Sequence, residues 1–208
     1  MLTVSQLSCR RGDRRLFSHV SFTLASGQWL HLEGDNGVGK TSLMRLICGL
    51  GVPEEGDITW RNEQASATDD DEPQTLRNNL IYLGHQLAIK EDLTPLENLQ
   101  THAAISGTPL STSKAMAALA QMGLRGREQL PVKVLSQGQK RRSALARLIV
   151  SEVPLWVLDE PFVALDGTAQ EVLRTVINSH LSHGGMVLLT SHQAVSLDGQ
   201  GRVYRLSA

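Results

Sequence analysis

Residues 34–42 read GDNGVGKTS and combine residue types suited to binding a phosphate chain. They match the pattern G-x-x-x-x-G-K-[ST], whose glycines let successive backbone N–H groups converge on phosphate oxygens. The match lies between an apolar run, WLHLE, and the apolar stretch LMRLICGL, so a strand, a loop and a helix follow one another as the chemistry requires. The residues predicted to contact a nucleotide triphosphate are Gly34, Asp35, Asn36, Gly37, Val38, Gly39, Lys40, Thr41 and Ser42.

Lys40 and Thr41 have the most specific predicted roles in this loop. The Lys40 ammonium is predicted to reach the outer phosphates, and the Thr41 hydroxyl to bind Mg²⁺. The positive end of the following helix adds to the attraction for phosphate. The alternative is a glycine-rich turn with an unrelated lysine, but the flanking strand and helix favour a phosphate-binding loop.

A second group of chemically capable residues is the acidic pair Asp159 and Glu160, which follows the apolar run of PLWVLDEP. A buried strand that ends in two carboxylates can hold Asp159 beside Mg²⁺, while Glu160 polarises a water for attack on the terminal phosphate. A strand that ends in a charged turn is the alternative. Taken alone, this segment does not decide between the two.

The first part of the chain that must position these residues is rich in strand patterns. Residues 1–33 alternate apolar and polar side chains between turns, which predicts antiparallel strands, and GDITWRN predicts another. The acidic stretch ASATDDDEPQ at 65–74 is predicted to be a solvated loop rather than a phosphate or metal site.

The remainder of the chain predicts helices interleaved with buried strands. NLIYLGHQ is predicted to be a strand, and the segments PLENLQTHAAI, TSKAMAALAQMG and SQGQKRRSALARLIVSE have helical spacing with starts near Thr94, Ser111 and Ser136. A strand LWVLD, a helix over about 168–181, a strand MVLLTS and a short strand RVYRL follow. This alternation predicts an α/β fold with a parallel sheet covered by helices on both faces.

Composition excludes several classes of protein. The chain has 208 residues, a formal charge of −1 and two cysteines far apart in sequence. It therefore lacks the basic character of a nucleic-acid-binding domain, and the cysteines predict unpaired thiols in a reducing compartment. No apolar run approaches the roughly 20 residues of a membrane span, and the N-terminus lacks the apolar core of a secretion signal. The sequence predicts a protein kept in the cytosol that needs a partner for any membrane role.

Six segments together resemble the ATP-binding cassette (ABC) ATPases. GDNGVGKT, Gln86, LSQGQ, LWVLDE, VALD and TSH occur in the order and approximate spacing of that family, and LSQGQ resembles its LSGGQ signature. The resemblance implies a P-loop NTPase core with an antiparallel β subdomain and an inserted helical subdomain. It further implies one ABC ATPase domain over 1–208, with a core formed by 1–86 and 152–208 and a helical subdomain at 87–151.

The resemblance also implies a head-to-tail pair of cassettes, each nucleotide lying between the phosphate loop of one copy and the signature of the other. Ser136, Gly138 and Gln139 then face ATP held by the second copy. Gln86 is implied to sense Mg²⁺ and the attacking water and to link the site to the helical subdomain. Asp166 is implied to bridge the copies, and His192 to act near the terminal phosphate. Each of these three residues has a purely structural alternative. Gln86 is then a surface glutamine, Asp166 a helix N-cap and His192 a hydrogen-bonded histidine at a strand end.

The sequence departs from the family pattern at three places, one of which is a pair of residues. Gln137 replaces the first signature glycine, which is tolerable if the contact there is made by a backbone N–H. Arg11 stands where an aromatic side chain often stacks on adenine; a guanidinium can also stack on a base. Phe162 and Val163 stand where a small hydroxyl pair is commoner, which puts the geometry between the two copies in question.

Two classes of function follow from the resemblance. One is the energy-coupling subunit of a membrane transporter, and the other is a soluble ABC ATPase such as an Fe–S assembly cassette. The segments YLGHQLAIKEDLTPLENL, LSQGQKRRSALARL, LDEPFVALD and GGMVLLTSHQ are similar to the ATP-binding export subunits of cytochrome c maturation. That similarity implies haem export or handling, and a position peripheral to the cytoplasmic face of the inner membrane. It implies as partners a second copy, an integral-membrane permease subunit that contacts roughly residues 87–99, and other cytochrome c maturation proteins, with no nucleic acid.

Overall fold

The computed structural model describes residues 1–61 and 76–207, so the predicted acidic loop at 65–74 lies outside the described residues. Two compact units divide the chain. The first comprises Met1–Gly84, Val153–Glu160 and His180–Ala208, and the second comprises His85–Glu152 and Pro161–Ser179. The domain limits inferred from the sequence stay a prediction.

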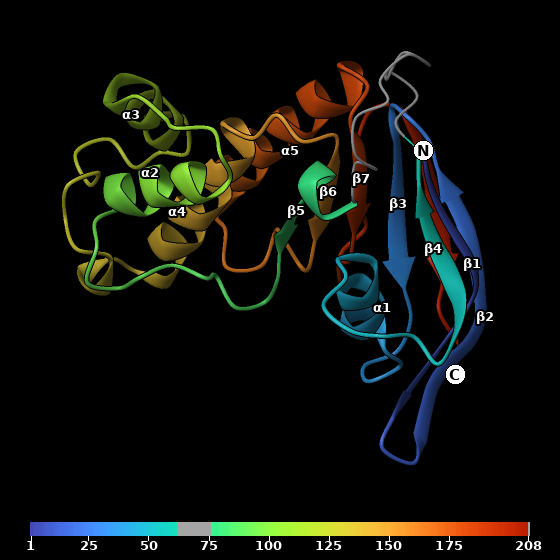
Figure 1. Cartoon of the computed structure of the whole chain (residues 1–208). Coiled ribbons are helices and arrows are strands. Elements are labelled where there is room, and N and C mark those ends of the chain that lie inside the picture. Colours follow the sequence, from blue (N-terminus) through green and yellow to red (C-terminus); the bar gives the residue numbers. More distant parts are fainter. Residues whose placement is uncertain (62–75, 208) are drawn as a thin grey trace. The chain divides into compact units, whose positions relative to one another are not determined.

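A five-stranded parallel sheet forms one layer of the first unit (Figure 1). Its strands are β3 (Gln28–Glu33), β5 (Leu80–Leu83), β6 (Leu155–Leu158), β7 (Met186–Leu189) and β8 (Gln200–Arg205), arranged in the order β5-β6-β7-β3-β8. β6 and β7 are buried along their whole length, which explains their continuous apolar sequences, because a strand covered on both faces has no polar side. The carboxyl ends of β3, β6 and β7 therefore meet at one edge of the sheet.

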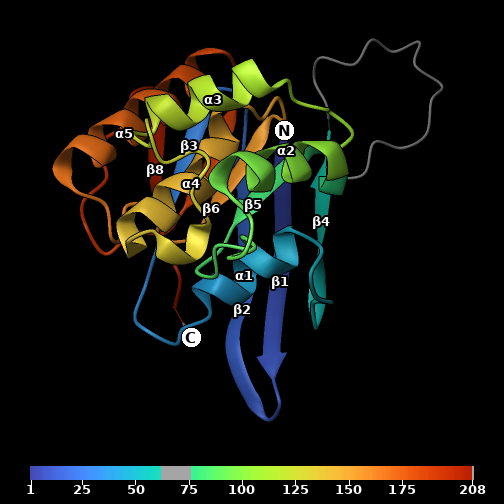
Figure 2. The same ribbon diagram turned by 90° about the vertical axis from the view of Figure 1, so that its left-hand side faces the viewer.

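An antiparallel sheet forms a second layer of the same unit. It consists of β1 (Leu2–Arg11), β2 (Arg14–Leu24) and β4 (Glu55–Trp60), in the order β2-β1-β4. Figure 2 shows β1 and β2 running side by side to the tight turn that joins them, where Arg11 pairs with Arg14. One hydrophobic core joins this sheet to β3, β6, β7 and the helix α1 (Lys40–Ile47); among its fully buried members are Leu2, Phe17, Leu30, Leu43, Met44 and Leu155.

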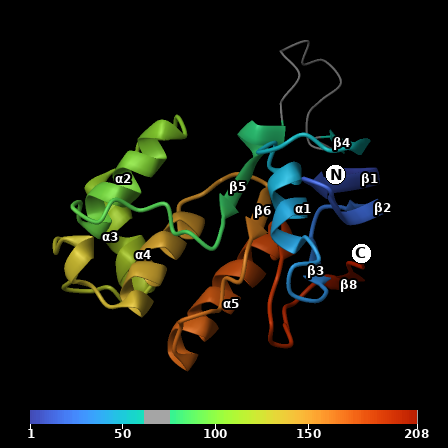
Figure 3. The same ribbon diagram turned by 90° about the horizontal axis from the view of Figure 1, so that it is seen from below.

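The second unit is helical, and Figure 3 shows α2 (Pro95–Ile105), α3 (Thr112–Gln121) and α4 (Gln137–Ile149) gathered together. Each begins at the predicted residue: the side chains of Thr94, Ser111 and Ser136 accept from the backbone N–H three residues on. Thr94 and Ser136 form full capping boxes with the acid or amide at the third helical position. A short 3₁₀ helix, η2 (Val132–Val134), precedes α4.

Two further elements complete the described chain. The 3₁₀ helix η1 (Leu76–Asn79) precedes β5. The helix α5 (Gly167–Ser182) matches the helix predicted over 168–181, and its residues from His180 onward belong to the first unit. The predicted α/β fold class, with a parallel sheet, antiparallel strands and a helical block, is confirmed.

Candidate active site

The phosphate-loop residues run from the end of β3 into the first turn of α1, which contains Lys40, Thr41 and Ser42. Gly34 has φ 146° and Gly39 has φ 111°, backbone conformations that residues with a Cβ rarely adopt. A Cβ at Gly34 would lie 2.6 Å from the Leu206 carbonyl oxygen, and one at Gly39 would lie 2.9 Å from the Phe17 ring. Both glycines are therefore required by conformation and by space.

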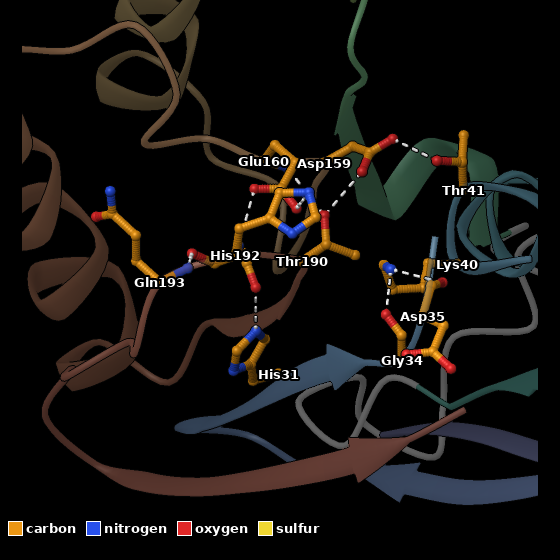
Figure 4. A network of polar contacts seen from close by, with 11 residues as sticks. His31, Gly34, Asp35, Lys40, Thr41, Asp159, Glu160, Thr190, His192 and Gln193 are labelled. Atoms are coloured by element: carbon orange, nitrogen blue, oxygen red, sulfur yellow. Dashed lines mark hydrogen bonds and ion pairs between the residues drawn. The ribbon is translucent and has the colours of Figure 1, made fainter. Parts of the chain in front are cut away.

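Lys40 lies across this loop, where its ammonium group donates to loop carbonyls. Its Nζ is 2.5 Å from the carbonyl oxygen of Gly34 and 3.1 Å from that of Asp35 (Figure 4). These two hydrogen bonds hold the positive charge of Lys40 at the phosphate loop. The positive charge at the loop favours the binding of an anion there.

Thr41, the next residue, is linked to the acidic pair at the end of β6. Its Oγ1 donates to Asp159 Oδ2 at 2.9 Å. Asp159 is 5% exposed, and its backbone N–H donates to the Leu83 carbonyl of the neighbouring strand at 2.8 Å. The extension of the β5–β6 pairing fixes the carboxylate at the sheet edge, where its oxygens and the Thr41 hydroxyl form a cluster of hard oxygen donors. Mg²⁺ prefers such donors.

Thr190 joins the two acidic residues from the adjacent strand. Its Oγ1 donates to Asp159 Oδ1 at 2.7 Å and accepts from the Glu160 backbone N–H at 2.9 Å. Thr190 itself is fully buried, and its own N–H donates to the Leu158 carbonyl at 3.0 Å. Thr190 is part of the TSH motif, but no role is predicted for it from the sequence. Its position directly after a buried strand, like that of Asp159, is the signal that could have found it.

Glu160 stands in a sparsely populated backbone conformation, with φ 50°. Strain of this kind is kept where the surrounding structure enforces it, often at functional sites. The His192 backbone N–H donates to Glu160 Oε2 at 3.2 Å, and His192 Nε2 is 3.6 Å from Glu160 Oε1. The Glu160 side chain is 16% exposed and that of His192 is 64% exposed. The carboxylate is thus sheltered, while the imidazole that faces it stays open to solvent.

A cleft of about 980 Å³ opens on this edge of the first unit. Its lining combines residues of the phosphate loop, the segment from Ser191 to Ala194 and two arginines, Arg14 and Arg205. Arg11, the residue predicted to stack on adenine, is exposed on the hairpin and pairs in register with Arg14. Its role in base recognition stays a prediction.

The remaining predicted site residues belong to the second unit. Gln86 is exposed, and Ser136 is exposed at the start of α4. The capping box there joins Ser136 and Gln139, with Ser136 N donating to Gln139 Oε1 at 3.0 Å. Gly138 is close to the carbonyl of Ala164, which a Cβ would meet at 3.0 Å. Asp166 Oδ1 accepts from the Ala169 N–H at 2.8 Å, so Asp166 caps the N-terminus of α5. This is the structural alternative given above for Asp166.

The comparisons with known proteins agree with this geometry. A family model described as "ABC transporter" matches residues 17–163. The chain belongs to the ABC transporter family. As a member it binds and hydrolyses ATP, which confirms the predicted enzyme class.

Curated relatives of this cassette are similar over nearly the whole chain. A relative from Dechloromonas aromatica, named "Cytochrome c biogenesis ATP-binding export protein CcmA", is 51% identical over 95% of this chain and 95% of its own. A second with the same name, from Nitrosospira multiformis, is 49% identical over 93% of this chain and 92% of its own. The resemblance to export subunits of cytochrome c maturation is confirmed by these names.

Solved structures share the fold of the cassette. The ATP-binding subunit of an ABC transporter is 28% identical, with a TM-score of 0.77 over 92% of this chain and 79% of that chain. A dimeric cassette, MJ0796, in a post-hydrolysis state bound to ADP and phosphate, is 24% identical, with a TM-score of 0.77 over 93% of this chain and 88% of that chain. The P-loop NTPase core predicted from the sequence is thereby confirmed.

Proposed function

We propose that the chain is the ATP-hydrolysing, energy-coupling subunit of a membrane export complex that serves c-type cytochrome biogenesis. The observation that supports the proposal is a cluster of five side chains at one edge of the parallel sheet (Figure 4). The five are Lys40, Thr41, Asp159, Glu160 and His192. The biological setting comes from relatives that are named as export proteins of cytochrome c biogenesis. The same names favour this function over a soluble Fe–S assembly cassette.

The phosphate chain of ATP is bound by this loop and its lysine. The backbone from Gly34 to Ser42 and the Lys40 ammonium contact the phosphates, and the start of α1 adds its positive dipole. Mg²⁺ is held by the Thr41 hydroxyl and the Asp159 carboxylate, with Gln86 as a further oxygen ligand. The hard oxygen donors of Thr41 and Asp159 fit this ion. When bound, Mg²⁺ neutralises charge that develops on the transferred phosphoryl group.

Hydrolysis depends on Glu160 and His192. The Glu160 carboxylate accepts a proton from the attacking water as the water oxygen bonds to the terminal phosphorus. The bond from that phosphorus to the bridging oxygen breaks, and ADP leaves with that oxygen. His192 contacts Glu160 through both its backbone N–H and its ring. We infer that the ring orients the carboxylate and contacts the terminal phosphate, and the two contacts with Glu160 support this role.

A second copy of the chain completes each site. Ser136, Gly138 and Gln139 of one copy contact ATP held by the phosphate loop of the other, with Asp166 at the junction. The exposed N-terminus of α4 supports this arrangement, because an exposed helix N-terminus attracts the anionic nucleotide. Gln86 links nucleotide binding to the helical subdomain.

The export complex requires a permease and places this chain at the cytoplasmic face of the inner membrane. Among the described residues, none of the helices is long and apolar enough to span a bilayer. We infer that residues 87–99 contact the permease and that other cytochrome c maturation proteins join the complex. Haem as the exported group stays a prediction from the resemblance.

Replacing Glu160 by glutamine tests the mechanism directly. Glu160→Gln keeps the shape of the side chain and removes the proton acceptor, so hydrolysis should fall by about 10² to 10⁴-fold while ATP binding survives. The trapped ATP should hold two copies together, which light scattering with Mg-ATP detects as an ATP-dependent dimer.

The second variant for this experiment is Ser136→Ala in the Glu160→Gln chain. It should weaken the dimer, since the hydroxyl contacts ATP across the interface. Hydrolysis at the wild-type rate by Glu160→Gln would remove Glu160 from the mechanism. A variant that stays monomeric at saturating ATP would argue against the paired site.

A further inference from the structure

His31 is a polar residue among the buried, apolar residues in the middle of β3, and the function proposed above gives it no role. It lies near the end of β3, three residues before Gly34 of the phosphate loop. Its neighbours Leu30 and Leu32 are 2% and 0% exposed, and His31 itself is only 4% exposed. Burying an imidazole at such a position costs free energy unless its nitrogens find partners.

The partner of His31 Nε2 is the backbone of the segment that carries His192. Nε2 lies 3.1 Å from the carbonyl oxygen of Ser191 (Figure 4). Since a carbonyl oxygen only accepts, this contact places a hydrogen on Nε2, so His31 donates to Ser191. The ring is therefore fixed to the peptide group that directly precedes His192.

The other ring nitrogen is turned toward a carboxylate at the start of the loop. His31 Nδ1 lies 3.6 Å from Glu33 Oε1, and Glu33 Oε2 lies 3.4 Å from an Arg205 nitrogen. His31 also lines the cleft that the phosphate loop borders. The two nitrogens of this buried ring thus face different segments. Nδ1 faces Glu33, at the end of β3, and Nε2 contacts Ser191, directly before His192.

Within the part of the chain that the structure describes, two other hydrogen bonds restrain the His192 segment, residues 191–193. Residues 191–193 lie outside the regular strands and helices. The His192 N–H donates to Glu160, and the Gln193 N–H donates to the Ser191 side chain within the same segment. The bond from His31 to Ser191 therefore restrains the backbone on the N-terminal side of His192, as Glu160 restrains it at His192 itself.

We propose that His31 is a positioning residue that holds the Ser191 carbonyl and thereby orients the His192 ring toward Glu160 and the terminal phosphate during ATP hydrolysis. The proposal rests on the proposed function. His31 contacts no reacting atom; it acts through the peptide that it anchors. It links the strand before the phosphate loop to the residue that faces the terminal phosphate.

The test replaces His31 in the full chain and separates turnover from binding. His31→Leu removes the donor by replacing the imidazole with an apolar side chain of similar size. The value of kcat should then fall by about 10- to 100-fold, because small displacements of a reacting group have effects of that size. The affinity for ATP, measured by nucleotide titration, should change by less than about threefold, because Lys40 and the loop glycines are untouched.

Two variants serve as references. His31→Gln supplies an amide donor that can reach the carbonyl, and it should recover most of the lost kcat. His183→Leu makes the same chemical change at an exposed histidine and should behave as the wild-type chain. A normal kcat for His31→Leu, a loss confined to ATP affinity, or equal losses for the leucine and glutamine variants would each overturn the proposal.

A double variant shows whether the effect passes through His192. In a His192→Ala chain the ring that His31 orients is gone, so adding His31→Leu should lower kcat by less than about twofold further. A full additional loss would mean that His31 acts by another route and would overturn the proposal. A wild-type chain that hydrolyses no ATP, alone or with its membrane partner, would instead contradict the proposed function itself.

Discussion

The Thr190 hydroxyl is hydrogen-bonded to both acidic residues at the end of β6 and helps to fix their positions. It donates to the Asp159 carboxylate and accepts from the Glu160 backbone. Asp159 is in turn joined to Thr41 of the phosphate loop. A single buried hydroxyl therefore fixes the spacing between the proposed Mg²⁺ ligand and the proposed base.

Thr190→Val removes that hydroxyl and keeps the shape of the side chain. Loss of the two buried hydrogen bonds should lower the free energy of unfolding by about 1 to 3 kcal/mol. Hydrolysis should fall by more than the loss of folded protein explains, because the backbone of Glu160 loses its anchor. Urea unfolding and steady-state hydrolysis on the same samples measure the two effects.

Thr190→Ser is the matched control for this change, because it keeps the hydroxyl and loses one methyl group. It should retain most of the hydrolysis. Equal activity in the valine and serine variants would show that the hydroxyl does not position Glu160.

Two glycines of the phosphate loop, Gly34 and Gly37, both have a positive φ but differ in the space available for a side chain. Gly34 has φ 146° and no room for a Cβ, since the Leu206 carbonyl oxygen would lie 2.6 Å away. Gly37 has φ 81°, with nothing within 4 Å of a Cβ placed there. The two positions therefore differ in steric space, although both need a backbone that glycine favours.

Gly34→Ala should destabilise the chain more than Gly37→Ala. Gly37→Ala should cost about 1 to 2 kcal/mol, the penalty for a side chain in a left-handed conformation. Gly34→Ala adds the clash with the backbone of Leu206. The midpoints of urea unfolding of the two variants give the comparison, and an equal or larger loss for Gly37→Ala would contradict the steric account.

Local signals in the sequence predicted the elements well and the contacts between them poorly. The starts of α2, α3 and α4 were predicted from Thr94, Ser111 and Ser136, because capping depends on residues three positions apart. The bonds of Thr190 and His31 join segments 31 and 160 residues apart. Such pairs depend on strand order, which periodicity does not specify.

The chemistry-bearing residues were predicted where a motif fixes their types. Lys40, Asp159 and Glu160 follow from the strand-loop-helix pattern and from a buried strand ending in acids. The positive φ of Glu160 was not predictable, because glutamate shows no local preference for that conformation.

At the scale of the whole molecule, His180 couples folding stability to pH. Its ring stacks on Trp156 with centroids 3.7 Å apart and planes 6° apart. Burial lowers the pKa of His180 from 6.5 to about 4. Between these two values the unfolded chain binds a proton that the folded chain does not, so this group lowers stability as the pH falls from 6.5 toward 4.

His180→Phe keeps an aromatic ring against Trp156 and removes the titration. The loss of unfolding free energy between about pH 7.5 and about pH 5 should be smaller in the variant by about 1 to 2 kcal/mol. Urea unfolding at the two pH values measures it. The same pH dependence in the variant and the wild type would show that His180 is not the group responsible, and His183→Phe provides the exposed control.

The proposed pairing of two copies should make the rate of hydrolysis depend on the concentration of the chain. If each site needs the signature residues of a second copy, hydrolysis by the purified chain should rise with the square of its concentration when most of it is monomeric. Addition of the membrane partner should raise the rate further, because it brings two copies together. A strictly linear dependence with one active site per monomer would argue against the composite site.

The backbone conformation of Glu160 lowers the stability of the fold, while the proposed hydrolysis needs the glutamate side chain at this position. Its φ of 50° is costly for any side chain and cheap for glycine. Repeated rounds of selection for heat resistance alone would therefore favour glycine at this position, and the survivors would be inactive. Engineering a more heat-resistant form of this cassette should hold position 160 constant, since the residue proposed to accept the proton from water is also one whose backbone conformation costs stability.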